Sequence, residues 1–132
     1  MHARSVVRNA LFFGSVDRTK IALPWTTYTD PEVAHVGQYP ADLEAKNIPY
    51  DTYYKPYKRC DRALCESKTG FIKVHVKKGS DEILGATAVG GPAGELISLL
   101  TSGMHNSLGL SKIGASVYPY PSWAEGIKHL AD

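Results

Sequence analysis

The stretch FIKVHV (residues 71–76), followed by a polar turn and then by ILGATAV (residues 83–89), decides the fold of this chain. Successive side chains of an extended segment point to opposite faces, so Ile72, Val74 and Val76 share one face of the first run. The turn between the two runs is polar and contains a glycine. The pattern predicts a β-hairpin.

A glycine-rich turn and a helix follow the hairpin directly. The turn reads GGPAGE at residues 90–95, the place between a strand and a helix where a phosphate-binding loop would lie. Its spacing is not G-x-G-x-x-G, and Glu95 would place a negative charge beside a phosphate. We therefore predict a tight strand-to-helix turn instead. The helix after it carries an apolar stripe of Ala93, Leu96, Ile97, Leu100 and Met104.

The rest of the chain adds shorter elements on both sides. They are an amphipathic helix over 3–13 with Gly14 as its C-cap, a short strand over 33–37, a helix over 41–46 that Pro40 can start and Asn47 can end, an extended segment over 50–57, and a closing helix over 124–131. This order of helices and strands predicts an α+β fold, with an antiparallel β-sheet flanked by helices.

The composition is that of one ordinary folded domain: 132 residues, 43% hydrophobic and 21% charged. The formal net charge of +2 argues against a nucleic acid or an anionic membrane as partner. The sequence shows no apolar run of the roughly 20 residues that cross a membrane, and we identify no signal peptide. Two cysteines do not make a disulfide scaffold, so we expect a reducing, cytoplasmic environment.

The cysteines and histidines suggest little chemistry by themselves. Cys60 and Cys65 lie too far apart in sequence for the usual zinc pair, and no second pair accompanies them. We interpret them as ordinary structural residues, with a redox pair or half of a metal site as the alternatives. The histidines share no fixed spacing with partner residues, so we expect most of them on the surface or in loops.

Tyr120 and Glu125 flank the motif PSWA near the end of the chain. The tyrosine can donate a hydrogen bond or, when ionised, bind a soft cation weakly. The glutamate stands near a predicted helix start, where it can orient a neighbour or cap backbone amides. Chemistry alone favours a packed aromatic ring and a capping carboxylate.

Several motifs occur together in a meaningful order. They are TDPEVAHVG (29–37), DRA (61–63), TGFIK (69–73), ILGA (83–86), VGGPAGELI (89–97) and YPSWAE (120–125). In this order they resemble the C-terminal dimerisation domain of pyridine nucleotide-disulfide oxidoreductases. The resemblance implies that residues 21–132 are a dimerisation (interface) domain with the FAD/NAD-linked reductase dimerisation-domain fold. It also implies that residues 1–20 are the last helix of an FAD domain and its linker.

The resemblance further implies an active site shared between two subunits. Most members have a His-Pro-x-x-x-Glu motif whose histidine acts as acid and base toward the partner's redox thiols. This chain has Tyr120 at the histidine position and Glu125 at the glutamate position, which resembles the mercuric reductase-like branch. The vicinal C-terminal cysteines of that branch are missing, and Cys60 and Cys65 do not align with the family's redox disulfide.

The implied parent is an oxidoreductase that uses FAD and NAD(P)H and forms a homodimer. We expect neither cofactor and no metal on this fragment, no catalysis by it alone, and contacts with the FAD and NAD(P) domains of the parent chain. Tyr120 and Glu125 are the predicted catalytic residues, acting on the partner subunit. The alternative is a stand-alone dimeric interaction module without enzymatic activity.

Overall fold

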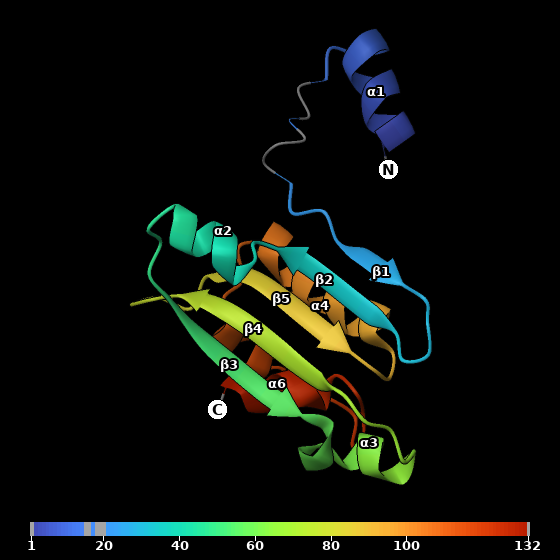
Figure 1. Cartoon of the computed structure of the whole chain (residues 1–132). Helices are drawn as coiled ribbons and strands as arrows, with labels where there is room; N and C mark the ends of the chain where they lie inside the picture. Colours follow the sequence, from blue (N-terminus) through green and yellow to red (C-terminus); the bar gives the residue numbers. More distant parts are fainter. Residues whose placement is uncertain (1, 15–16, 18–20, 132) are drawn as a thin grey trace.

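A five-stranded antiparallel sheet forms the centre of the molecule in the computed structural model, which describes residues 2–14, 17 and 21–131 (Figure 1). The strands lie in the order β1-β2-β5-β4-β3. Their bounds are Trp25–Thr27 (β1), Val33–Gly37 (β2), Tyr50–Pro56 (β3), Phe71–Lys77 (β4) and Ile83–Val89 (β5). The predicted hairpin is β4–β5, and it occupies the inner part of the sheet because β2 pairs with β5 and β3 pairs with β4.

Helices accompany this antiparallel sheet, so the predicted α+β fold is confirmed. They are α1 (His2–Leu11), α2 (Pro40–Ala45), the 3-10 helix η2 (Tyr57–Arg59), α3 (Asp61–Cys65), α4 (Ala93–His105), α5 (Leu110–Gly114) and α6 (Glu125–Ala131). The sequence pattern missed η2, α3 and α5, which span only three to five residues each. Segments this short do not complete the apolar repeat by which a helix is recognised.

Helices α4 and α6 cover one face of the sheet, and the core lies between them and the strands (Figure 1). The predicted apolar face of β4 points into this core, where Ile72 and Val74 are buried. The stripe of α4 packs on it, and Gly126 in α6 lets the helix approach Ile72 closely. Burial of each large aliphatic side chain contributes about 1.5–3 kcal/mol, so this layer accounts for much of the stability.

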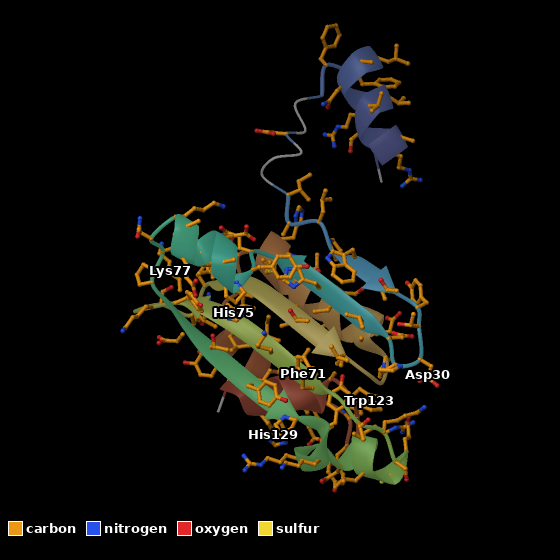
Figure 2. All side chains as sticks on the ribbon, viewed as in Figure 1. Asp30, Phe71, His75, Lys77, Trp123 and His129 are labelled. Carbon is orange, nitrogen blue, oxygen red and sulfur yellow. The ribbon has the colours of Figure 1, made fainter. Side chains whose placement is uncertain are left out.

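The opposite face of the sheet holds two buried histidines, which corrects the expectation that most histidines lie on the surface or in loops. His35 in β2 and His75 in β4 are each 2% exposed. His35 stacks on Tyr39 with the ring centroids 3.8 Å apart, and His75 meets Tyr50 edge-on. Figure 2 labels His75 on the sheet. Aromatic neighbours exclude water from these rings without any covering helix.

Both histidines are hydrogen-bonded in a way that suits the neutral imidazole. His35 Nε2 lies 3.1 Å from the carbonyl oxygen of Gly37, which can only accept, so Nε2 carries the proton and Nδ1 accepts from Thr87 at 2.9 Å. Nδ1 of His75 lies 2.9 Å from the hydroxyl of Thr52. Within the described residues, Nε2 of His75 is buried without a hydrogen-bond partner. Burial lowers the pKa of both rings.

Helix α1 stands apart from the sheet (Figure 1). It ends at Leu11, two residues before the predicted end, and Phe13 rather than Gly14 takes the left-handed backbone conformation after it. Its apolar side chains Val6 and Leu11 are exposed, as is Phe12 directly after it. The predicted linker over 15–20 lies outside the described residues except for Asp17.

Candidate functional site

The loop that carries Tyr120 and Glu125 is fixed to the domain by Trp123. The indole ring meets the ring of Tyr57 edge-on, with the centroids 5.0 Å apart, and it also lies against Gly91. Gly90 and Gly91 both have positive φ angles, of 82° and 56°, a conformation that favours glycine. The glycine turn therefore provides the flat surface on which the C-terminal loop is held.

Tyr57 holds the same turn from the inside. Its hydroxyl donates a buried hydrogen bond of 2.8 Å to the carbonyl oxygen of Gly90. Burial raises the pKa of Tyr57 well above its ordinary value, so the phenol stays neutral and remains a donor. Aromatic side chains thus pack on both glycines of the turn. Strand β5 ends at Val89 and helix α4 begins at Ala93, so the prediction of a tight strand-to-helix turn is confirmed.

The start of α4 has a capping residue that the sequence did not reveal. The backbone N–H of Gly94 donates to Oε2 of Glu32 at 3.2 Å, across 62 residues of chain. A carboxylate at this position satisfies an unpaired N–H and is stabilised by the helix dipole. Glu32 belongs to the motif TDPE, so the motif itself was the available signal.

Tyr120 projects from the domain surface and is 71% exposed. Its hydroxyl donates a hydrogen bond of 2.8 Å to Oδ2 of Asp61, the first residue of α3. This bond to a carboxylate raises the pKa of Tyr120, because the bond and the negative charge both favour the protonated phenol. Asp61 was not among the predicted site residues, since no local pattern connects it to a tyrosine 59 residues away.

Glu125 begins α6 and lies at the same corner of the molecule. Its backbone N–H donates to Ser122 Oγ at 3.3 Å, and its carboxylate lies 3.8 Å from Nε2 of His129 one turn later. Only 19% of its side chain is exposed. The negative charge of Glu125 contributes to the raised pKa of Tyr120, so the structure brings the two predicted site residues into electrostatic contact.

Lys55 of β3 completes the charged surroundings. Burial is the largest influence on its ammonium group and lowers its pKa, while the carboxylates of Glu125 and Asp61 act in the opposite direction. The corner therefore combines two carboxylates and one lysine around an exposed phenol. The sequence analysis named Tyr120 and Glu125 as candidates but did not name Asp61 or Lys55, which the structure places beside them.

The two cysteines are free thiols near this corner. Cys60 is buried beside α6, whereas Cys65 is exposed at the end of α3, so they face different surroundings. In the part of the chain that the structure describes, no group of three or more His, Cys, Asp or Glu residues could hold a metal ion.

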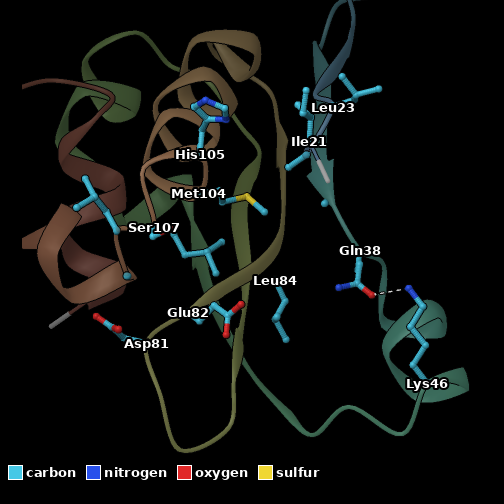
Figure 3. Close-up of a pocket in the computed structure, with 15 residues that line it drawn as sticks. Ile21, Leu23, Gln38, Lys46, Asp81, Glu82, Leu84, Met104, His105 and Ser107 are labelled. Atoms are coloured by element: carbon cyan, nitrogen blue, oxygen red, sulfur yellow. Dashed lines mark hydrogen bonds between the residues drawn. The ribbon is translucent and has the colours of Figure 1, made fainter. Parts of the chain in front are cut away.

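A separate open hollow of about 990 Å³ lies at the other end of β4, beside the β4–β5 turn (Figure 3). Its walls mix apolar residues such as Leu84 and Met104 with charged ones such as Asp81 and Glu82. Lys46 donates to Gln38 Oε1 across one side at 2.8 Å. Tyr120 and Glu125 do not line this hollow.

Comparison with known proteins establishes the family. Residues 23–131 match the model of the pyridine nucleotide-disulphide oxidoreductase dimerisation domain. The chain therefore belongs to this family and consists largely of its dimerisation domain. Among the helices described, none has the length and hydropathy of a membrane-spanning segment.

Relatives of known sequence and structure agree with this assignment. Mercuric reductase from Shigella flexneri is 34% identical over 108 residues, which cover 81% of this chain and 19% of the relative. Dihydrolipoyl dehydrogenase from Cupriavidus necator is also 34% identical, over 83% of this chain and 23% of that protein. This chain thus spans about a fifth of the length of such relatives.

Solved structures show the same fold. The HOCl-induced flavoprotein disulfide reductase RclA from Escherichia coli superimposes with a TM-score of 0.87 at 20% identity, over 97% of this chain and 30% of that one. LpdA from Mycobacterium tuberculosis gives a TM-score of 0.85 at 23% identity, over 96% of this chain and 28% of that one.

Proposed function

We propose that this chain is the dimerisation part of a flavin- and NAD(P)H-dependent disulfide oxidoreductase of the mercuric reductase-like branch. In that enzyme, Tyr120 and Glu125 complete the active site of the partner subunit. The observation that carries the proposal is the exposure of the Tyr120 phenol, at 71%, on a loop held rigidly by Trp123. A reactive group presented outward in this way suits a site that a second copy completes.

The cofactors of this proposed enzyme do not fit the residues described here. The glycine turn packs against Trp123 and Tyr57, and the carboxylate of Glu32 accepts a hydrogen bond at the start of the helix that follows it. The two cysteines are free thiols, with Cys60 buried and Cys65 exposed. We therefore place FAD, NAD(P)H and the redox disulfide in other domains of the parent chain, and we expect the domain alone to be inactive.

We place the protein in the reducing cytoplasm. We expect it to form a homodimer, with no nucleic acid or membrane contact from this segment. Free Cys60 and Cys65 suit such a compartment. The domain division at residues 20 and 21 is part of the same proposal. The exposed apolar side chains at the end of α1, Leu11 at 70% and Phe12 directly after it at 71%, suit a helix that packs on a neighbouring FAD domain.

A subunit-mixing experiment tests the shared site in the full-length parent. One variant carries Tyr120→Phe together with Glu125→Gln, and the other has its redox cysteines replaced by serine. Each homodimer should turn over poorly. Mixed dimers should regain turnover, because one of their sites combines intact thiols from one subunit with intact Tyr120 and Glu125 from the other. Mixed dimers no more active than the parents would show that the residues act within their own subunit or not at all.

The alternative, a stand-alone dimeric module without enzymatic activity, is less consistent with the exposed apolar residues of α1. The genomic sequence upstream of Met1 separates the two. A continuous open reading frame that encodes a G-x-G-x-x-G motif and a cysteine pair supports the enzyme. A stop codon followed by a ribosome-binding site supports the module.

A further inference from the structure

We propose that Asp61 is a positioning residue that accepts a hydrogen bond from the hydroxyl of Tyr120, so that the phenol oxygen faces the partner subunit as an acceptor. This inference deepens the proposed function and rests on it for the identity of the partner. It states which residue of the Asp61–Tyr120 pair donates the hydrogen bond and which accepts it.

The geometry sets the direction of this hydrogen bond. A phenol has a single O–H to donate, and Tyr120 donates it to Oδ2 of Asp61 at 2.8 Å. The lone pairs of the phenol oxygen remain, on a side chain that is 71% exposed. The group that approaches from the partner must therefore bring a hydrogen of its own, as a protonated thiol or an ammonium group does. A bare thiolate would find no hydrogen to accept from this hydroxyl.

The backbone around Asp61 keeps the acceptor in place. Asp61 is the first residue of α3, between the buried Cys60 and the buried Ala63. The N–H of Leu64 donates to the carbonyl of Cys60 at 3.0 Å, which closes the helical turn that contains Asp61. The carboxylate therefore does not depend on an exposed flexible loop for its position.

The surrounding charges favour the protonated, neutral form of the Tyr120 phenol. The hydrogen bond and charge of Asp61, the charge of Glu125 and the nearby thiol of Cys65 all raise the pKa of Tyr120. Lys55 from β3 is the cation that interacts with both carboxylates. A neutral phenol that is already donating to Asp61 is thus the stable form at neutral pH, which argues against a tyrosinate base in place of the family's histidine.

Titration of the Tyr120 phenol in the 132-residue chain tests the inference. NMR of protein labelled with ¹³C at the tyrosine ring carbon next to oxygen resolves the tyrosines, and the signal lost in Tyr120→Phe identifies residue 120. Asp61→Asn should lower the titration midpoint of Tyr120 toward the ordinary tyrosine value. Asp61→Glu, which keeps a charged acceptor, should hold the midpoint above that of the asparagine variant. Asp51→Asn, which removes an exposed carboxylate on β3, is the matched control and should leave it unchanged.

An unchanged midpoint in Asp61→Asn would overturn the inference. If circular dichroism shows that this variant does not fold, Asp61→Ser removes the same charge and gives the same test. The titration needs no partner subunit and no substrate. Its failure therefore leaves the shared active site untouched, and failure of the subunit-mixing experiment leaves the Asp61–Tyr120 bond untouched.

Discussion

The indole of Trp123 lies so close to Gly91 that a β-carbon on residue 91 would come within 2.7 Å of two ring carbons. This contact joins the C-terminal loop to the turn between β5 and α4. Because Tyr120 and Glu125 stand on either side of Trp123, the contact also fixes the position of the candidate site. Two glycines that resemble a nucleotide motif in sequence thus serve the packing of an aromatic ring.

Gly91→Ala should destabilise the domain by about 2–4 kcal/mol, because the new methyl group collides with Trp123 and the backbone has a φ of 56°. Urea unfolding followed by fluorescence measures the loss. The control is Gly79→Ala, where φ is 78° but nothing lies within 4 Å of the added carbon. That variant should lose only about 1–2 kcal/mol. Equal losses would mean that backbone strain, and not the contact with Trp123, explains the effect.

Tyr57→Phe should cost about 1–3 kcal/mol, because it leaves the buried carbonyl oxygen of Gly90 without its donor. The aromatic contact with Trp123 is kept, so the fold itself should persist. Thermal unfolding by circular dichroism is the measurement. Tyr53→Phe on the exposed part of β3 is the control and should change stability by less than about 0.5 kcal/mol. If Tyr57→Phe left the stability unchanged, the stabilising role of the hydroxyl would be contradicted.

Stability should fall as the pH is lowered below about 6.5, the ordinary pKa of histidine. The folded state lowers the pKa of His35 and His75, mainly through burial, so the unfolded chain binds more protons in this range. Unfolding free energy therefore rises with pH, by at most about 1.4 kcal/mol per pH unit for each histidine, until the unfolded value is passed. Urea titrations between pH 5 and 8 measure the slope.

Variants at single histidines separate this effect from other groups. His75→Asn can keep the hydrogen bond with Thr52 but no longer titrates, so it should reduce the slope. His105→Asn, at the exposed end of α4, should leave it unchanged. A slope that His75→Asn does not alter would show that other groups control the pH dependence.

The hairpin β4–β5 and helix α4 could be predicted because these elements are long enough to display their apolar repeats in full. Each strand has seven residues and the helix has 13. The histidines were misjudged for a physical reason. The alternation of side chains in β4 places His75 on the face opposite the apolar one. Aromatic side chains on the face of His75 bury its ring. The contact of Asp61 with Tyr120 could not be predicted, because the two residues are 59 positions apart and the bond exists only once the chain has folded.

Self-association is the most direct test of the central claim that this is a dimerisation domain. Sedimentation equilibrium of the 14.4 kDa chain at micromolar concentration should give twice that mass, since interfaces of obligate dimers are large and apolar. The variant Val7→Glu with Phe12→Glu removes apolar surface from α1 and should still dimerise. A monomer mass at all micromolar concentrations, or a dimer lost in the α1 variant, would contradict the account.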